Sequence, residues 1–393
     1  MTPALQSSNA PEKQLLVLCA RTRISAENAA EITTLLSRSL DWDLFASESL
    51  ENSVTPLVIR ALRAHGWTAV SAEWQARFND MERRIAMRGM MLTAELLRLL
   101  DAFATRGVRA IPYKGPVLAA QAYGDFTLRE YEDLDLILPQ RDMLAANEII
   151  VGFGYKPKYD WIFSANAEAT LVPGEYNYRD YSRHAMIELH TERTLRHFPV
   201  APDIDAFLAN RVPVRLADHE VMTFAQEDLL TMLCIHGSKD FWERLSWISD
   251  ISELVQSKPN FDWSHARKFA EARRATRMVR LGLALARALF DTPLPPEIAS
   301  QVAADTVATA RAESIARRLV RRPFNTLSGT QRFAYRREMQ EGTAAGWRYA
   351  SRLAVLPAEE DWEFVQLPPS LAPLYIALRP IRLLKKYGMG RHD

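Results

Sequence analysis

The sequence predicts an α+β protein in which a small β-containing core lies between two helical regions. Apolar residues recur at three- and four-residue steps in the first hundred residues and again from about 217 to 320, which is typical of amphipathic helices. Between about 107 and 200 the apolar residues alternate, as they do in strands. The expected regions are a helical N-terminal region (1–104), an α/β core (105–215) and a helical C-terminal region with a basic, proline-containing tail (216–393).

The N-terminal region is expected to contain two well-marked helices. One begins after Asn52-Ser53, where Pro56 suits the first turn of a helix. The other is long and amphipathic, begins near Ala76 and ends at Gly107, because glycine is favoured just past a helix terminus.

Three β-type runs mark the core. Residues 108–113 and 133–138 are short and apolar, whereas residues 178–192 form a longer alternating run. A helix is predicted over 139–154, and residues 155–178 are predicted as strand or loop. Strands interspersed with helices indicate an α/β or α+β unit.

Composition and charge restrict the possible functions. The chain has 393 residues and a net charge of +1, so its overall charge does not favour nucleic acid or a membrane as partner. Two cysteines, Cys19 and Cys234, do not make a disulfide framework and suit a reduced cytoplasm. No stretch approaches the roughly 18 apolar residues of a membrane span, and the N-terminus lacks a signal-peptide pattern. We therefore expect a cytoplasmic protein without a membrane span.

Two aspartates begin the second β-type run. Alternate side chains of a strand share a face, so Asp133 and Asp135 point together while Leu134, Leu136 and Leu138 pack inward. Two carboxylates about 6–7 Å apart repel each other unless a cation lies between them. A hard divalent ion, Mg²⁺ or Mn²⁺, suits this pair, and substrate phosphates usually complete such sites. Aspartates at this spacing also occur in solvated turns and edge strands, so the pair alone is a weak signal.

Residues before and after the pair strengthen the metal hypothesis. Lys114 and Gly115 follow the first run, and Pro116 suits the first turn of a helix there. A glycine at such a turn lets backbone N–H groups approach phosphate. On the third run Glu188 and His190 share a face, which makes Glu188 a candidate third carboxylate.

These residues resemble the DNA polymerase β-type nucleotidyltransferase superfamily, and more narrowly its bacterial nucleotidyltransferase family proteins. The shared pattern is K-G, then a helix, then L-R-x-x-x-D-[LI]-D-[LI], and later E-[LV]-H. In this sequence the pattern falls on Lys114-Gly115, Leu128-Arg129, Asp133 to Leu136, and Glu188 to His190. The resemblance extends over roughly residues 14 to 260.

The resemblance implies a small mixed sheet with the two aspartates on one strand and the third acid on its neighbour. It implies that Asp133 and Asp135 bind two metal ions, Mg²⁺ or Mn²⁺, and that Glu188 binds the ion at the acceptor. It also implies the transfer of an NMP group from an NTP to a hydroxyl or phosphate acceptor, with release of pyrophosphate. His190 is expected to bind substrate or to orient Glu188, or else to be a structural histidine.

Two residues depart from the family pattern. Pro116 has no N–H to donate, so phosphate binding is expected to rely on Lys114 and Arg129. Glu132 precedes the first aspartate, where relatives tend to have a small residue, and adds negative charge beside the expected triphosphate. Both departures favour an alternative function, a catalytically inactive nucleotide-binding or regulatory protein on the same fold.

The segment from His236 to Asp250 is predicted as one helix. Its polar stripe consists of His236, Asp240, Glu243, Trp247 and Asp250. Such a stripe is usually a solvated face. The resemblance instead implies that this helix lines the cleft opposite the metals, where His236, Lys239 and Trp247 contact base, ribose or acceptor.

The charge balance also bears on the acceptor. Binding of a long nucleic acid depends on many Lys and Arg contacts with phosphates, so a small molecule or a protein or peptide side chain is the expected acceptor. A metal-dependent glycosyltransferase, which also holds a nucleotide diphosphate with Asp-x-Asp, is a further alternative. Such an enzyme typically has a nucleotide-binding α/β region before the motif, where this sequence predicts helices.

Overall fold

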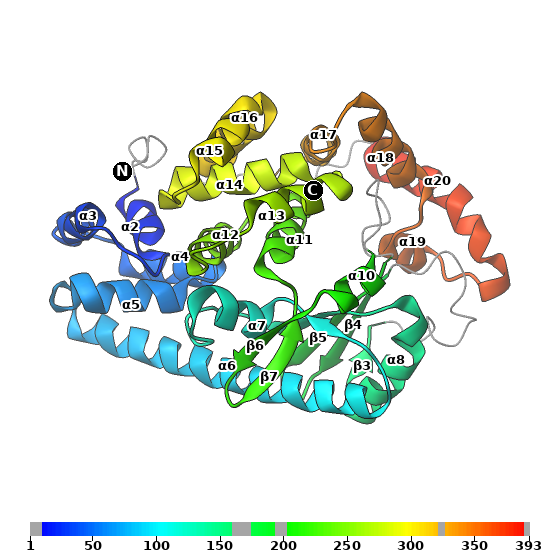
Figure 1. The fold of residues 1–393 in the computed structure, drawn as a ribbon, viewed down its shortest axis with the longest axis horizontal. Helices are drawn as coiled ribbons and strands as arrows, with labels where there is room; N and C mark the ends of the chain where they lie inside the picture. The colour runs from blue at the N-terminus through cyan, green and yellow to red at the C-terminus, as the bar shows by residue number, and fades with distance from the viewer. Residues whose placement is uncertain (1–9, 159–173, 193–202, 321–326, 389–393) are drawn as a thin grey trace. The chain divides into compact units, whose positions relative to one another are not determined.

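The structure, a computed structural model, describes residues 10–158, 174–192, 203–320 and 327–388 (Figure 1). The contacts within the chain divide it into two compact units, each assembled from three separate segments. The helical unit comprises Met1–Glu95, Tyr113–Glu132 and Val212–Met339. The sheet unit comprises Leu96–Pro112, Asp133–Arg211 and Gln340–Asp393.

The helical unit combines helices with one β-hairpin. Its first segment contains α2 (Pro11–Cys19), α3 (Ala26–Leu36), α4 (Trp42–Glu51), α5 (Thr55–His65), the 3-10 helix η1 (Trp67–Ala69) and most of α6 (Ala72–Thr105). Its second contains α7 (Gly115–Leu118) and the π-helical turn η2 (Ala119–Tyr123). Its third contains β6 (Val212–Leu216), β7 (His219–Thr223), α11 (Gln226–Lys239), α12 (Leu245–Ser257), α13 (Trp263–Ala272), α14 (Thr276–Phe290), α15 (Pro296–Ala304), α16 (Thr306–Leu319) and α17 (Gly329–Glu338). Helix α14 packs against α11, α12 and α16 at the centre of this unit.

Within the residues that the structure describes, the sheet unit contains five strands and a group of C-terminal helices. Its strands are β1 (Ile111–Pro112), β2 (Asp133–Ile137), β3 (Lys156–Pro157), β4 (Glu175–Asp180) and β5 (Ala185–His190). Its helices are η3 (Gln140–Asp142), α8 (Met143–Gly152), α10 (Ile204–Ala209), α18 (Thr343–Val355), α19 (Glu359–Phe364), η4 (Pro369–Leu374) and α20 (Tyr375–Gly388). The strand order is β1-β2-β5-β4-β3, and only the central β2–β5 pair is parallel. The predicted α+β class with a small mixed sheet and helices at both ends is confirmed.

The core of the sheet unit follows from the alternation of its strands. Leu134 and Leu136 of β2 and Ile187 and Leu189 of β5 are at most 1% exposed. Helix α8 lies beside the sheet (Figure 1), and the Tyr178 hydroxyl of β4 donates to an Asn147 oxygen of α8 at 3.1 Å. The central strands are therefore held by side-chain packing as well as by the backbone ladder.

Two helix predictions for the N-terminal region are confirmed. Helix α5 begins at Thr55 with Pro56 in its first turn. The long amphipathic helix is α6, which begins four residues earlier than expected and ends at Thr105. Gly107 then adopts φ +70°, a left-handed conformation that disfavours side chains.

Two details of the core differ from the sequence-based expectation. The alternating run 178–192 is not one strand: β4 ends at Asp180, and β5 begins at Ala185 after a turn in which His184 has φ +51°. The alternation of 212–223 escaped prediction, although it forms the β6–β7 hairpin before helix α11. In both cases the chain reverses direction at a turn that contains neither glycine nor proline, the residues from which a turn is usually predicted.

The prediction of one helix from His236 to Asp250 is wrong. Helix α11 ends at Lys239, and Phe241 and Trp242 both have positive φ before α12 begins. The Trp242 side chain is fully buried against Gly237, where an added Cβ would lie 2.6 Å from the indole ring. Burial of this large side chain offsets the strained turn.

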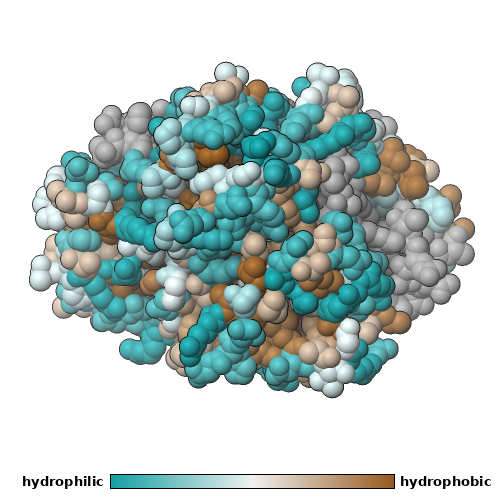
Figure 2. All heavy atoms as spheres, viewed as in Figure 1, coloured by the Kyte–Doolittle hydropathy of each residue, from teal (hydrophilic) through white to brown (hydrophobic). Residues whose placement is uncertain are grey.

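Hydrophilic side chains cover most of the visible face, with hydrophobic ones between them (Figure 2). Among the helices that the structure describes, none combines the length and the apolarity needed to cross a bilayer.

Candidate functional site

The pairing of β2 with β5 places the predicted acidic residues next to each other. The strands run parallel, with Asp135 opposite Glu188 and Ile137 opposite His190. Paired residues of neighbouring strands project from the same face of a sheet. One face of this strand pair therefore carries Asp135, Glu188 and His190.

These three side chains form a compact polar cluster. His190 Nε2 lies 3.1 Å from Asp135 Oδ1 and 3.8 Å from Glu188 Oε2. One ligand atom from each residue lies within 4.8 Å of the other two, a spacing at which one metal ion can contact all three. Asp135 and His190 are buried, whereas Glu188 is half-buried and gives the cluster a partly open side.

The first predicted carboxylate is placed differently. Asp133 begins β2, lies opposite Met186 and is half-buried. It points to the same face as Asp135 but one strand repeat away, about 6–7 Å along the chain. Among the residues described, the group that can contact one ion consists of Asp135, Glu188 and His190, without Asp133.

The electrostatics of the cluster favour a cation. Two carboxylates near each other in a buried environment repel, and each loses hydration that only a positive charge or hydrogen bonds can replace. The His190 ring supplies one such contact to Asp135. A divalent ion bound by the two carboxylates and the imidazole would supply the rest, because all three groups are metal ligands.

Lys114 and Gly115 form the predicted turn after a strand. Tyr113 separates them from the end of β1 at Pro112, and α7 begins at Gly115 with Pro116 in its first turn. Gly115 has φ +54°, so the turn requires a residue without a side chain. The helix lasts only four residues before the π-helical turn. Lys114 Nζ lies 5.2 Å from the centre of the Tyr113 ring.

Arg129 is bound inside the helical unit. Its Nε and Nη2 donate to the two carboxylate oxygens of Asp250 on α12, at 2.9 and 3.0 Å. The Tyr123 hydroxyl donates to the same carboxylate at 2.8 Å. Burial raises the pKa of Tyr123 well above its ordinary value, and Asp250 adds to the effect, so the hydroxyl stays protonated and donates. Arg129 thus fixes the segment before β2 to α12.

The broken helix still brings two predicted residues together. The rings of His236 and Trp247 lie 5.0 Å apart in an edge-to-face arrangement. His236 Nδ1 lies 3.3 Å from Asp240 Oδ2. Lys239 is half-buried, and its carbonyl accepts a hydrogen bond from Arg336 at 3.1 Å. The turn between α11 and α12 therefore brings a histidine of α11 and its acidic neighbour Asp240 close to an aromatic ring of α12.

Two glutamates before β2 differ in their environments. Burial raises the pKa of Glu130 to about 7, a hydrogen bond from Thr55 opposes the shift, and the negative charge of Glu132 adds to it. Glu132 itself is exposed, and its backbone carbonyl accepts from Arg88 at 3.1 Å. The extra charge noted in the sequence therefore lies in water, where it is screened.

Sequence reasoning missed the role of one residue and underrated another. Asp250 belongs to a polar stripe for which no role of this residue was predicted, yet its side chain is 2% exposed and binds Arg129. His190 was expected to bind substrate, to orient Glu188 or to be structural, and its Nε2 lies closer to Asp135 than to Glu188. The alternation of the third β-type run already placed His190 on the face of Glu188, so the signal for it was present.

Comparison with known proteins agrees with these features. No curated protein matches the chain. Residues 38–291 match the profile of a family described as "Uncharacterised nucleotidyltransferase", a range that includes every segment of the predicted pattern and the α11–α12 turn. Since the match extends over more than half of the chain, the protein belongs to this family of nucleotidyltransferases.

Proposed function

We propose that the protein is a metal-dependent nucleotidyltransferase that moves an NMP group from an NTP to a hydroxyl or phosphate acceptor. The family supports the reaction class. The observation that carries the proposal is the alignment of Asp135 with Glu188 on parallel strands, with His190 beside them. Fold alone would not suffice, because one fold hosts many functions.

The proposed ions are Mg²⁺ or Mn²⁺: Asp135 and Glu188 would hold one, and Asp133 would help Asp135 to hold a second. The donor set fits such an ion, because carboxylate oxygens are the preferred ligands of both. His190 either completes the set through Nε2 or orients Asp135, from which that atom lies 3.1 Å. When bound, the ions would lower the charge of the triphosphate and activate the acceptor oxygen.

The protein's own residues have positioning roles in the reaction. The acceptor oxygen forms a bond to the α-phosphorus, the bond to the β-phosphate oxygen breaks, pyrophosphate leaves and the acceptor proton passes to solvent. We assign phosphate contacts to Lys114 and Gly115, and contacts with base, ribose or acceptor to His236, Lys239 and Trp247. This chemistry depends mainly on positioning and charge neutralisation, so side chains of these types are sufficient.

Arg129 was expected to bind phosphate, and we now propose a positioning role instead. Two of its N–H groups already bind Asp250, and its side chain is 9% exposed. Holding the segment 123–129 against α12 would keep the loop before β2 in a fixed conformation.

The acceptor is proposed to be a small molecule or a protein or peptide side chain. A net charge of +1 does not favour a long nucleic acid, whose binding depends on many Lys and Arg contacts with phosphates. We also propose that the protein acts in the cytoplasm, because Cys19 and Cys234 are both free and buried.

A catalytically inactive nucleotide-binding protein is the second candidate. Pro116 favours it, because this residue removes an N–H from the turn where phosphate is expected. Such a protein would bind an NTP without transferring its nucleotidyl group.

The test is incubation of the protein with each α-labelled NTP and Mg²⁺ or Mn²⁺, together with a cell lysate fraction as the source of acceptor. We expect label on the protein or on a lysate component, and loss of that label in the Asp133→Ala/Asp135→Ala variant. Equal labelling by the variant would contradict the assignment of these residues. NTP binding without any transfer would favour the inactive alternative.

A further inference from the structure

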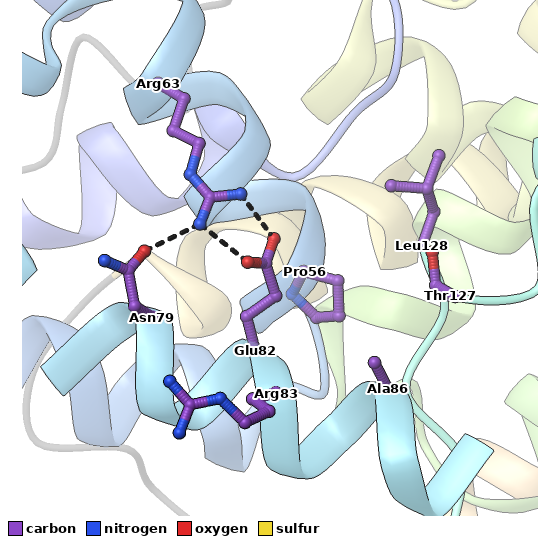
Figure 3. A pocket seen from close by; sticks show the side chains of 8 residues that line it. All are labelled: Pro56, Arg63, Asn79, Glu82, Arg83, Ala86, Thr127 and Leu128. Carbon is purple, nitrogen blue, oxygen red and sulfur yellow. Dashed lines mark hydrogen bonds and ion pairs between the residues drawn. The ribbon is translucent and has the colours of Figure 1, made fainter. Parts of the chain in front are cut away.

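A cavity in the helical unit is not used by the proposed reaction. It has a volume of ≈ 530 Å³ and lies between α5, α6 and the loop before β2. Figure 3 shows Arg63 of α5 facing Glu82 of α6, with Thr127 and Leu128 across the space. This volume is within the range of small-molecule sites.

The polar side of the cavity is held in a fixed geometry. Arg63 donates from both terminal nitrogens to the two carboxylate oxygens of Glu82, at 2.8 and 2.6 Å, and to Asn79 Oδ1 at 2.7 Å. The guanidinium also lies over the Trp67 ring, 5.4 Å from its centre. A guanidinium has five N–H donors, so two remain for a ligand, as does the Asn79 amide NH₂ group. The N–H donors of Arg63 and Asn79 therefore lie next to the carboxylate oxygens of Glu82, which accept hydrogen bonds.

The opposite wall is also rigid. The Thr127 backbone N–H and hydroxyl both donate to Asp125 Oδ1, at 2.8 and 2.7 Å. Arg129 is bound to Asp250, and the Tyr131 hydroxyl donates to the Gly89 carbonyl at 3.2 Å. Because the wall is anchored on both sides, a ligand would lose little free energy in ordering it.

The charge of the cavity favours an anion. Glu82 neutralises Arg63, but Arg83 also lines the space, is 70% exposed and comes no closer than 3.9 Å to Asp80. Asp80 is shared with Arg84, so one positive charge remains in excess on the Arg83 side.

We propose that this cavity binds a hydroxyl-rich small molecule that carries one anionic group, such as a sugar phosphate or a sugar acid. Hydroxyl groups both donate and accept, which matches the alternating donors and acceptors of Arg63, Asn79 and Glu82. Pro56 and Leu128 offer apolar surface to the carbon faces of the ring. Binding requires neither a metal ion nor an NTP, so the inference is independent of the proposed function.

The test is calorimetric titration of the full chain in EDTA with four separate probes: glucose 6-phosphate, glucuronate, glucose and inorganic phosphate. We expect one of the two sugar anions to bind at least roughly tenfold more tightly than glucose or phosphate. The two sugar anions distinguish a phosphate from a carboxylate as the anionic group. Asp135→Asn should bind the same probe with unchanged affinity, because Asp135 is not part of this cavity.

Arg83→Ala and Arg84→Ala form a matched pair of variants. Both arginines are exposed residues of α6 next to Asp80, but only Arg83 lines the cavity. Arg83→Ala should weaken binding by roughly tenfold, and Arg84→Ala by less than about twofold. The proposal is overturned if no sugar anion binds below about 10 mM, if phosphate alone binds as tightly, or if the two variants weaken binding equally.

Discussion

Two regions of the molecule hold polar side chains in place by different means. In the sheet unit the backbone ladder between β2 and β5 aligns Asp135 with Glu188. In the helical unit a turn with two left-handed residues brings His236 beside Trp247, and the buried Trp242 anchors that turn. The first arrangement depends on backbone register, and the second depends on packing. Substitutions in the cluster of β2 and β5 should therefore remove activity while the fold persists. Substitutions in the turn between α11 and α12 should lower the stability of the fold.

The largest effect is expected from Asp135→Asn. The substitution keeps the shape of the side chain but removes a charge that binds metal, so nucleotidyl transfer should fall by at least about 10²-fold. Initial rates of label transfer measure this loss. Glu148→Gln is the control, because Glu148 is an exposed carboxylate of α8 in the same unit and pairs with Arg106. Equal rates for Asp135→Asn and the parent protein would contradict the metal assignment.

The next largest effect is expected from Arg129→Met. The variant leaves the buried Asp250 carboxylate without its cationic partner Arg129, which typically costs about 3–5 kcal/mol of unfolding free energy. Urea denaturation followed by tryptophan fluorescence measures the loss. The double variant Arg129→Met/Asp250→Leu should recover most of the lost unfolding free energy, because it leaves no unpaired charge buried at this site. A double variant as unstable as the single one would show that the ion pair is not the cause.

A smaller loss is expected from Gly237→Ala. The added Cβ would lie 2.6 Å from the Trp242 ring, so the turn between α11 and α12 must shift, at a cost of about 1–3 kcal/mol. Gly152→Ala is the control, because Gly152 ends α8 and nothing lies within 4 Å of its added Cβ. In thermal unfolding, Gly237→Ala should therefore have a lower melting temperature than Gly152→Ala. If both are as stable as the parent protein, packing of Trp242 does not hold the turn.

The smallest effect concerns pH and the loop before β2. The pKa of Glu130 is raised to about 7 in the folded protein, above the ordinary value of 4.5, so the folded state holds this proton more tightly than the unfolded state. The contribution of Glu130 to stability is therefore fully present below about pH 4.5 and is lost as the pH rises towards 7. Glu130→Gln should gain stability relative to the parent protein across this window and show no further gain above it. Melting temperatures measured at pH 5 and pH 7.5 test the sign, and a constant difference would contradict it.

The strand pair could be predicted from the sequence because its signal is local. Alternation places Asp133 and Asp135 on one face, and the same rule places Glu188 and His190 on one face of β5. The expectation that the two strands are neighbours came from the family resemblance rather than from the residues, and their parallel direction was not predicted. The inclusion of His190 in the cluster needed the register itself, since Ile137, not an acid, lies opposite it.

The helix pair could not be predicted because its signal is not local. Polar residues at helical spacing continue from His236 to Asp250, and no glycine or proline stands at the break. The turn forms because Trp242 packs against Gly237 and Gly282, and Gly282 lies on α14. The ion pair of Asp250 could not be predicted for the same reason: its partner Arg129 is 121 residues away in the chain.

Anomalous diffraction from crystals soaked in Mn²⁺ would test the metal assignment most directly. We predict a peak within coordination distance of Asp135 and Glu188, with His190 beside it, and no such peak in crystals of Asp135→Asn. A further ion bound by Asp133 would agree with the two-metal proposal. Absence of Mn²⁺ between Asp135 and Glu188, under conditions in which the protein transfers label, would contradict the assignment of these residues as the metal centre.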